Sequence, residues 1–433
     1  MNDANPPERP QAPSPDVASS TPTPRHSRWL TVTLVAQMAL GLLAMTICLP
    51  SMLDWPRIFG ASQAQVQLSF SVFVATYGGL QLVHGPLSDR IGRKPVLLAG
   101  LVIFLAGSLL GASSPNVWTL TLARALQGAG AAAGMVVGRA MVQDLYAGAA
   151  RTRMMAFVGM TMGVCPPTAL VLGGQMHVRL GWQSTFVLMA CAAALLAVAT
   201  WRILPAGRLA SASAGAGAGA GAAPGAAPAA IPGGLKALLA GYGTLLKHKA
   251  FLLYVGMLSS CAATFYTFLG GAPLLLAGYG VTPEQIGWYM MSLPIAYIVG
   301  NILVTRLIHT RGDHFLMNIG QSATVFAMAL LLVLGLAGLN TPVALAIAIA
   351  FMGIGHGLLV PPTLAGTVGV IPVLAGSAAA VAGLLQQVTG AFGGFVVGLV
   401  QHTASVNLAM QMLGWTAIGV IAQYFLYRVH ARR

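Results

Sequence analysis

The chain has 433 residues, of which 57% are hydrophobic and 7% are charged, and its net charge at neutral pH is +14. Because a soluble domain carries about 25% charged residues, this composition excludes an ordinary soluble domain and predicts an all-α protein in a lipid bilayer. Lysine and arginine stand in short loops beside apolar stretches and form no basic face, so no nucleic-acid partner is expected. The four cysteines lack metal-ligand spacing, and neither a metal nor a cofactor is predicted.

Residues 1–29 are rich in proline and are expected to form a disordered cytoplasmic tail. Twelve apolar stretches follow, each near the roughly 20 residues that cross about 30 Å of hydrocarbon as a helix. Residues 30–205 and 250–428 hold six stretches each, which predicts two six-helix bundles, and residues 429–433 form a basic cytoplasmic tail. The expected spans are 31–53, 66–87, 95–113, 117–141, 154–177, 183–204, 250–275, 283–307, 314–338, 341–363, 371–399 and 407–428.

Residues 206–249 separate the two bundles and are rich in glycine, alanine and proline. Alternating glycine and alanine has neither a polar nor an apolar face, so most of this segment is expected to be a flexible cytoplasmic linker. Its end differs, because Leu235, Leu238, Tyr242 and Leu245 recur at helical spacing beside lysines. That pattern predicts a short helix suited to the membrane surface.

The basic residues predict which side of the membrane each loop faces. With the first tail in the cytoplasm, 19 of the 22 lysines and arginines lie on or near the cytoplasmic side. Arg57 and Arg179 fall on the other side, and Arg124 falls within a span. Because cytoplasmic loops carry an excess of lysine and arginine, both termini are expected in the cytoplasm.

A dense group of charges interrupts the apolar pattern between the second and third spans. We call its sequence "GPLSDRIGRKP", residues 85–95, the signature loop. Holding a loop in the cytoplasm explains its basic residues but explains neither its acid nor its glycines, which allow close backbone approach. A latch, meaning a contact that holds parts of the protein together in one state, is therefore the competing hypothesis. The latch candidates are Gly85, Asp89, Arg90, Gly92, Arg93 and Lys94, with Arg139 and Asp144 at the end of the fourth span.

The signature loop closely resembles the loop signature of the major facilitator superfamily. "LARALQGAGAAAG" in the fourth span, "RAMVQDLY" after it and "GSAAAVAGLLQQVTGAFGG" in the eleventh resemble the bicyclomycin and chloramphenicol resistance (Bcr/CflA) branch of drug exporters. The resemblance covers about residues 31–428 and implies the major facilitator fold, in which twelve transmembrane helices form two six-helix bundles around a central cavity. It also implies a bacterial inner-membrane location and a latch that clamps the two halves on the cytoplasmic side when the cavity faces outward.

Two positions depart from that branch. Relatives commonly carry an acid in the first span where this chain has Thr46, and a second proline in the fifth span where it has Leu170. Both features accompany proton-coupled export in relatives. Proton antiport and transport without protons therefore both remain open.

Buried ionisable residues are the candidates for transport and coupling. No acid lies in the middle third of a predicted span, and Asp54 at the outer end of the first span comes nearest, with a helix-end role as its alternative. Arg124 lies inside a span, where an arginine costs about 2.5–3.5 kcal/mol to insert, so it either faces a cavity or bonds to carbonyls of neighbouring helices. His356 lies deep in the tenth span and either titrates during transport or bonds to a backbone carbonyl.

Polar side chains within apolar spans need hydrogen-bond partners, so each either lines the cavity or links two helices. The resemblance implies that the first, fourth, seventh and tenth spans line the cavity. The cavity candidates are Gln37, Thr46, Tyr77, Gln81, Gln127, Tyr266 and Gln386.

We expect a secondary transporter that exports small neutral or anionic, largely apolar compounds by alternating access. A metabolite carrier with weak or no proton coupling is the alternative. An enzyme or a receptor is not expected, because no nucleophile–base motif or metal cluster is recognisable in the sequence. The expected partners are the lipid bilayer, a small-molecule substrate and, if transport is coupled, protons, with the protein acting as a monomer.

The predicted orientation can be tested with reporters fused after Arg433. We expect a fluorescent protein at this position to fluoresce and alkaline phosphatase to be inactive, because both report a cytoplasmic C-terminus. Active phosphatase together with a dark fluorescent protein would contradict the even number of spans.

Overall fold

The computed structural model describes residues 28–146, 148–204, 234–400 and 404–431. All elements in these ranges are helices, which confirms the predicted all-α fold. The expected N-terminal tail and most of the expected linker lie outside the described residues. Helix α8 (Gly234–Lys247) confirms the short helix predicted at the end of the linker.

Helix ends in the N-terminal half follow from local signals. Ser62 and Gln65 form a reciprocal capping box before α3, in which the Ser62 hydroxyl accepts from the Gln65 backbone N–H at 3.3 Å. The Asn116 side chain caps α5 by accepting from two backbone N–H groups. Gly92 separates α3 from α4 with φ +103°, a left-handed conformation that glycine adopts without steric cost. The elements are α1 (Arg28–Thr46), η1 (Ser51–Leu53), α2 (Trp55–Phe59), α3 (Gln63–Ile91), α4 (Arg93–Ala112), α5 (Val117–Leu145), α6 (Gly148–Leu180) and α7 (Gln183–Ile203).

The C-terminal half uses the same kinds of signal. Thr341 caps α12, its hydroxyl accepting from the Ala344 backbone N–H at 3.2 Å. Helix α11 is 45 residues long and is divided into two arms by Gly312, which has φ +74° and non-helical geometry. The elements are α9 (Lys249–Gly278), α10 (Pro283–Met290), α11 (Ser292–Leu336), α12 (Pro342–Gly369), η3 (Pro372–Leu374), α13 (Ala375–Val397) and α14 (Ser405–Ala431).

Ten helical stretches in the described part of the chain are long and apolar enough to cross a membrane. One of them, Pro283–Leu336, has 54 residues, which is about 80 Å of helix and more than twice the thickness of the hydrocarbon. Helix α6 is helical over 33 residues but is not among the ten. These two places account for the difference from the twelve predicted spans, and the count of twelve stays a prediction.

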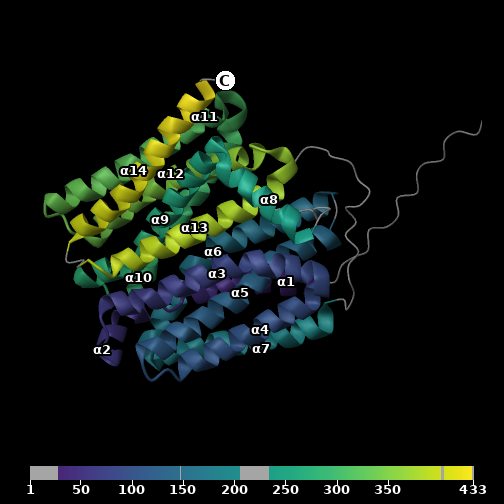
Figure 1. Cartoon of the computed structure of the whole chain (residues 1–433). Helices are drawn as coiled ribbons and strands as arrows, with labels where there is room; N and C mark the ends of the chain where they lie inside the picture. The colour runs from purple at the N-terminus through teal and green to yellow at the C-terminus, as the bar shows by residue number, and fades with distance from the viewer. Residues whose placement is uncertain (1–27, 147, 205–233, 401–403, 432–433) are drawn as a thin grey trace, which may run out of the picture.

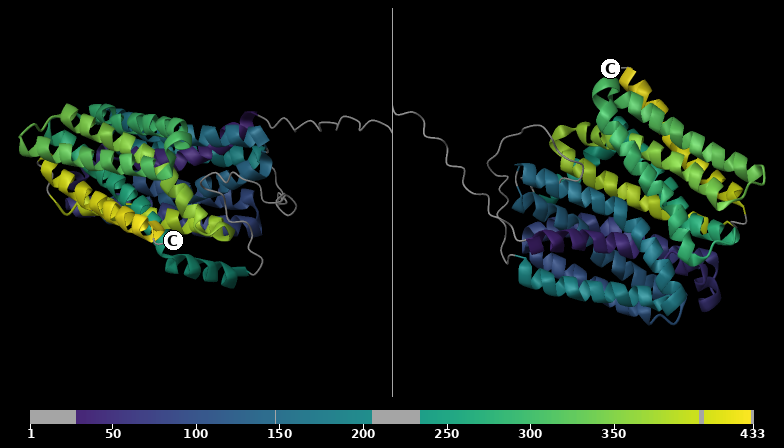
Figure 2. Two further views of the ribbon diagram at one scale, coloured as in Figure 1. Left: turned by 90° about the horizontal axis from the view of Figure 1, so that it is seen from above. Right: turned by 180° about the vertical axis from the view of Figure 1, so that it is seen from behind.

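The two halves lie side by side (Figure 1). Helices α1–α7, in purple and blue, form one bundle, and α9–α14, in green to yellow, form the other, a division that Figure 2 shows from above and from behind. Across the boundary, α3 packs on α13 and α6 packs on α10. We call the end of the molecule that carries α2 and α10 the α2 end, and the end that carries α8 the α8 end.

At the α2 end the halves touch through their backbones. A Cβ atom at Gly174 of α6 would lie only 2.3 Å from the Pro283 carbonyl oxygen at the start of α10. The Gln67 side-chain amide of α3 donates to the Gly270 carbonyl of α9 at 3.0 Å. Because small residues let helices approach closely inside a membrane, these contacts close the molecule at this end.

Helix α8 is anchored to the C-terminal half at the other end. Leu245 is fully buried in a cluster with Phe251 of α9 and Ala378 of α13. The amphipathic stretch predicted from the sequence therefore packs on protein through this leucine, which fixes where the end of the linker attaches.

The closed α2 end generates a test of the packing. Replacing Gly174 with Val should push α6 away from α10, because the new side chain would overlap the Pro283 carbonyl. We expect a several-fold increase in labelling, by an impermeant maleimide in whole cells, of a cysteine placed at Gln67, which is 1% exposed. Gly414→Val is the matched control, since a Cβ there meets nothing within 4 Å. Equal labelling in both variants would contradict the inferred closure.

Candidate functional site

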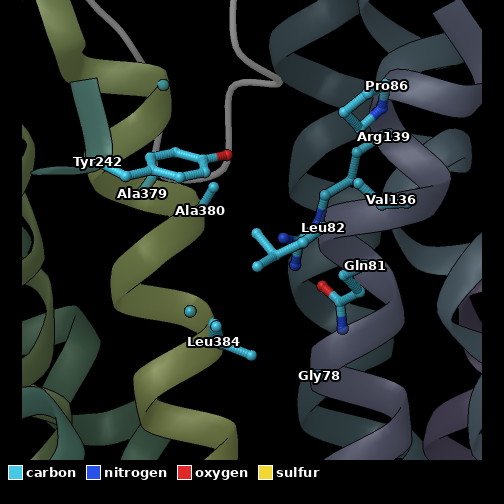
Figure 3. A pocket seen from close by; sticks show the side chains of 13 residues that line it. Gly78, Gln81, Leu82, Pro86, Val136, Arg139, Tyr242, Ala379, Ala380 and Leu384 are labelled. Atoms are coloured by element: carbon cyan, nitrogen blue, oxygen red, sulfur yellow. The ribbon is translucent and has the colours of Figure 1, made fainter. Parts of the chain in front are cut away.

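A cleft opens between the halves at the α8 end (Figure 3). Helices α3 and α5 form one wall, and α13 with α8 forms the other; Leu82 and Leu384 extend into the gap from opposite walls. Its volume is about 150 Å³, below the roughly 300–1,000 Å³ of pockets for drug-sized ligands, so a larger ligand requires the walls to move apart. The lining residues are Gly78, Gln81, Leu82, Gly85, Pro86, Val136, Arg139, Tyr242, Gly376, Ala379, Ala380, Gly383 and Leu384.

The polar lining consists of Gln81, Arg139 and Tyr242, and the described residues that line the cleft include no carboxylate. In Figure 3 the Tyr242 hydroxyl points from α8 toward the opposite wall. Partial burial raises the pKa of the Tyr242 phenol above its usual range, so the hydroxyl stays protonated at neutral pH and can donate a hydrogen bond. The cleft therefore combines a positive charge and neutral hydrogen-bonding groups with small and aliphatic walls.

Contacts between α3, α9 and α13 form the floor of the cleft. A Cβ atom at Gly78 would lie 2.2 Å from the Gln387 Cβ, so α3 and α13 are in backbone-close contact there. The Tyr266 hydroxyl donates to Gln387 Oε1 at 3.1 Å, and the Tyr266 ring packs on Phe70 with centroids 6.1 Å apart. Tyr266 thus lies at the boundary between the halves, beneath the cleft lining.

Arg124 is buried among helices of the N-terminal half and is 1% exposed. Its guanidinium donates to the Ala44 carbonyl at 2.8 Å, to Gln127 Oε1 at 2.9 Å and to the Met45 carbonyl at 3.5 Å. It also lies 4.1 Å from the centre of the Phe73 ring, a cation–π contact. In this conformation Arg124 bonds to the backbone of a neighbouring helix, and its predicted role in transport stays a prediction.

The Ala44 and Met45 carbonyls can accept hydrogen bonds from Arg124 because α1 ends next to them, at Thr46. Pro50 has no N–H, and the residue before a proline avoids helical geometry, so the helix stops at Thr46. The Leu49 N–H then bonds to the Thr46 carbonyl at 3.1 Å rather than to that of Met45. The Thr46 hydroxyl donates to the Pro166 carbonyl of α6 at 3.3 Å and is fully buried, so it is not part of the cleft lining.

Two of the predicted cavity glutamines link helices inside the N-terminal half. The Gln37 amide donates to the Thr200 hydroxyl of α7, and the Gln127 amide donates to the Ser108 hydroxyl of α4 at 2.9 Å. Each glutamine is 1% exposed. Of the seven predicted cavity residues, Gln81 lines the cleft.

The other candidates lie at separate places. Tyr77 is 5% exposed and its ring stacks on Phe73 with centroids 6.1 Å apart. His356 is 5% exposed in α12, and its Nε2 has no hydrogen-bond partner among the described residues. Gln386 is half-buried on α13, and its neighbour Gln387 makes the contacts at the floor of the cleft.

Asp54 lies at the α2 end, where it precedes α2. One carboxylate oxygen lies 2.9 Å from Nε2 of His177 in α6, and the other lies 3.6 Å from the Arg57 guanidinium. The structure thus places Asp54 in a helix-end pair with a histidine, a partner that the sequence did not suggest. Its predicted part in coupling is untested.

The signature loop is organised around Arg93. Its guanidinium pairs with Asp89 one turn earlier, donates to the Ser88 hydroxyl at 2.6 Å and donates to Asp144 of α5 at 3.0 Å. The Lys94 ammonium donates to the carbonyls of Trp201 and Leu204 at the end of α7, at 2.7 and 2.8 Å. These bonds join α3, α4, α5 and α7, all within the N-terminal half.

The remaining latch candidates surround this group. Arg90 is exposed, Gly85 lines the cleft with Arg139, and Gly92 forms the turn between α3 and α4. The Asp144 carboxylate pairs with Arg93. The loop lies beside an open cleft, and the predicted clamp between the halves remains a prediction.

Most of the cleft wall that α13 contributes was not predicted from the sequence. Gly376, Ala379, Ala380 and Gly383 line the cleft, and their i, i+3, i+4, i+7 spacing places them on one helix face. That spacing was visible in the sequence, but small residues give no sign of whether they face lipid, another helix or a cavity. Tyr242 was assigned to a surface helix, and only its position in space brings it to the mouth of the cleft.

The Arg124 geometry predicts a structural defect. Replacing Arg124 with Leu leaves the Ala44 carbonyl and Gln127 Oε1 without this donor, and each unpaired buried group costs about 1–3 kcal/mol. We expect the apparent unfolding temperature in detergent to fall by roughly 5–10 °C, with little effect from Arg57→Leu at the exposed α2 end. A stable Arg124→Leu protein without transport would instead favour the cavity role.

Comparison with known proteins identifies the family. The sequence model described as "Major Facilitator Superfamily" matches residues 31–394. Multidrug resistance protein D of Escherichia coli is 28% identical over 393 residues, which cover 89% of this chain and 93% of that protein. A chloramphenicol resistance protein of Pseudomonas aeruginosa is 25% identical over 407 residues, which cover 91% of each chain.

The arrangement of helices is also that of a solved transporter. The crystal structure of a D-xylose–proton symporter superposes with a TM-score of 0.69 at 14% sequence identity, covering 93% of this chain and 98% of that one. This likeness concerns the fold, and it confirms the expected two-bundle architecture. The matched family and its fold are those of transporters rather than enzymes. The chain is therefore a multi-pass membrane protein that belongs to the major facilitator superfamily.

Proposed function

We propose that this protein is a bacterial inner-membrane exporter of small neutral or anionic, largely apolar compounds. The observation that carries the proposal is the lining of the cleft, which has one arginine, one glutamine, one tyrosine and otherwise small or aliphatic residues. Such a lining suits apolar compounds with a few polar atoms, because few polar groups of the protein are left unpaired when the ligand binds.

The charge of the cleft sets the proposed selectivity. A ligand cation about 6 Å from the Arg139 guanidinium would be repelled by roughly 3 kcal/mol at an effective dielectric constant of about 20. That energy corresponds to about a hundredfold in affinity. The described lining residues include no carboxylate, so we expect permanent organic cations to be poor substrates.

The names of relatives support the direction of transport. The chain resembles multidrug resistance protein D and a chloramphenicol resistance protein over about nine-tenths of its length. A bicyclomycin resistance protein homologue of Haemophilus influenzae is 23% identical over 401 residues. Resistance is the property common to these names, and we propose that this chain confers resistance by exporting the compounds.

Alternating access supplies the proposed mechanism. The molecule is closed at the α2 end and has its cleft at the α8 end, which the Lys and Arg asymmetry assigns to the cytoplasm. A compound would enter there, and rocking of the halves would then close this end and open the α2 end. The signature loop would hold the closed cytoplasmic end, with Asp89 and Arg93 exchanging their present bonds for contacts with the C-terminal half.

Proton antiport is the driving force that we propose for export. The Asp54 carboxylate and the His177 imidazole lie 2.9 Å apart at the α2 end, which the same assignment places outside. Rearrangement of this end would change the pairing of the two groups. A pH gradient across vesicles should therefore stimulate transport, and Asp54→Asn should weaken the stimulation.

The charge selectivity can be measured in everted membrane vesicles energised with a pH gradient. We expect vesicles with the protein to take up a neutral amphenicol-like compound well above the level taken up by vesicles without it. Uptake of ethidium should stay near that background level. Arg139→Gln should reduce the difference in uptake between the neutral compound and ethidium, because it removes the positive charge and keeps a hydrogen-bonding side chain. Arg202→Gln, at an exposed position at the end of α7 and outside the cleft lining, serves as the control. Robust ethidium transport by the unmodified protein would overturn the proposed selectivity.

A further inference from the structure

A second hollow lies between the second arm of α11 and α14. This side of the C-terminal half faces away from the N-terminal half (Figures 1 and 2). We call it the α11–α14 groove. It has a volume of about 470 Å³, within the roughly 300–1,000 Å³ of pockets that hold one small ligand. Six side chains with polar atoms line it, namely Asn318, Gln321, Ser322, Gln423, Tyr424 and Tyr427.

With the Gly312 break at the membrane surface, the groove would lie at the level where lipid headgroups give way to acyl chains. Gly312 marks the end of the α11 arm, so Asn318 and Ser322 lie about 9 and 15 Å along the helix from it. On α14, Tyr427 lies one turn from the helix end at Ala431. Val325, which also lines the groove, lies deeper along α11.

One buried acceptor in the groove lacks a donor. The Gln423 amide donates to Asn318 Oδ1 and to the Tyr427 hydroxyl, both at 2.8 Å. The Gln321 amide donates to the Thr416 carbonyl at 3.3 Å. However, Gln321 Oε1 has no partner among the described residues, although the side chain is only 6% exposed. A hydroxyl or amide N–H of a bound ligand could donate the hydrogen bond that this buried oxygen lacks.

Positive charge lies at the mouth of the groove. The Arg428 guanidinium lies 4.7 Å from the centre of the Tyr424 ring, which itself lines the groove. This position directs the charge back along α14 toward the lining, as long cationic side chains at helix ends commonly do. Arg311 and the acid Asp313 stand at the break of α11, so Arg428, Arg311 and Asp313 together carry one net positive charge.

We propose that the α11–α14 groove binds an anionic lysophospholipid, a lipid with one acyl chain and a free glycerol hydroxyl. The phosphate would lie at Arg428, and the glycerol hydroxyl would donate to Gln321 Oε1. The single chain would run along Val325, Phe326 and Val420, which form the apolar part of the lining. A lipid with two acyl chains has both glycerol-backbone oxygens acylated and therefore has no free hydroxyl at that level.

The site is separate from transport through the cleft. Its residues belong to α11 and α14, whereas the cleft is lined by α3, α5, α8 and α13. Binding therefore does not depend on the direction or the substrate of transport, and it can be measured on the purified protein without a transport assay.

The experiment uses the purified full chain in phosphatidylcholine nanodiscs and a lysophosphatidylglycerol with a photoreactive group on its acyl chain. We expect cross-links to peptides that contain residues 318–326 and 420–427, and competition by unlabelled lysophosphatidylglycerol. Diacyl phosphatidylglycerol should compete at least tenfold less well. Equal competition by the two lipids would overturn the assignment of a single-chain ligand.

Variants separate the parts of the proposed site. Arg428→Gln should weaken binding about fivefold, the effect of one basic residue on an anionic lipid. Gln321→Met should also weaken it, and Ser322→Trp should block the groove, whereas Arg57→Gln at the α2 end should bind like the unmodified protein. Unfolding temperatures without added lipid show that each variant is folded. Unchanged cross-linking in folded Ser322→Trp protein, or dimers that this variant abolishes, would overturn the proposal.

Discussion

Helices inside a bilayer cannot be held together by exclusion of apolar surface from water, because lipid tails are as apolar as the side chains. Close packing and interhelical hydrogen bonds must do this instead, and in this protein they depend on glycine and alanine. Gly174 brings α6 onto the start of α10, and Gly78 brings α3 onto α13. Where these contacts exist the halves are joined, and where α3 and α13 separate beyond Gly78 the cleft begins.

The same constraint explains how polar groups are placed. Pro50 ends α1 inside the membrane region and frees backbone carbonyls that lipid cannot satisfy. Arg124 donates to these carbonyls and to Gln127, which in turn bonds to Ser108. The broken end of α1, an arginine and a glutamine of α5, and a serine of α4 thus form one hydrogen-bonded unit. In this conformation the unit holds the N-terminal bundle together beside the cleft.

Charges at the α8 end form a second connected unit, centred on Arg93. Its bonds to Asp89, Ser88 and Asp144 all lie within one half. An ion pair that bridged the halves would resist their separation, whereas pairs within one half leave the cleft free to open. The present bonding is therefore consistent with the proposed exchange of partners during transport. In the present state these charges hold the N-terminal bundle together, and in the proposed other state they would hold the two halves together.

The sequence by itself determined much of this protein. Apolar stretches of membrane-spanning length predicted the all-α fold, because helices satisfy their own backbone groups in lipid. The glycine- and alanine-rich segment between two sets of six stretches predicted the two bundles. Gly85 to Lys94 identified the family, and leucine spacing located α8. The separate roles of Arg124 and Gln81, both polar residues in apolar helices, were not readable, because helix rotation and the partner across the interface decide which side chain meets a cavity. Only the tertiary structure decided that Arg124 bonds to the broken end of α1, that α13 presents its small face to the cleft, and that Tyr242 reaches the cleft mouth. These outcomes depend on contacts between segments far apart in sequence, which no local pattern encodes.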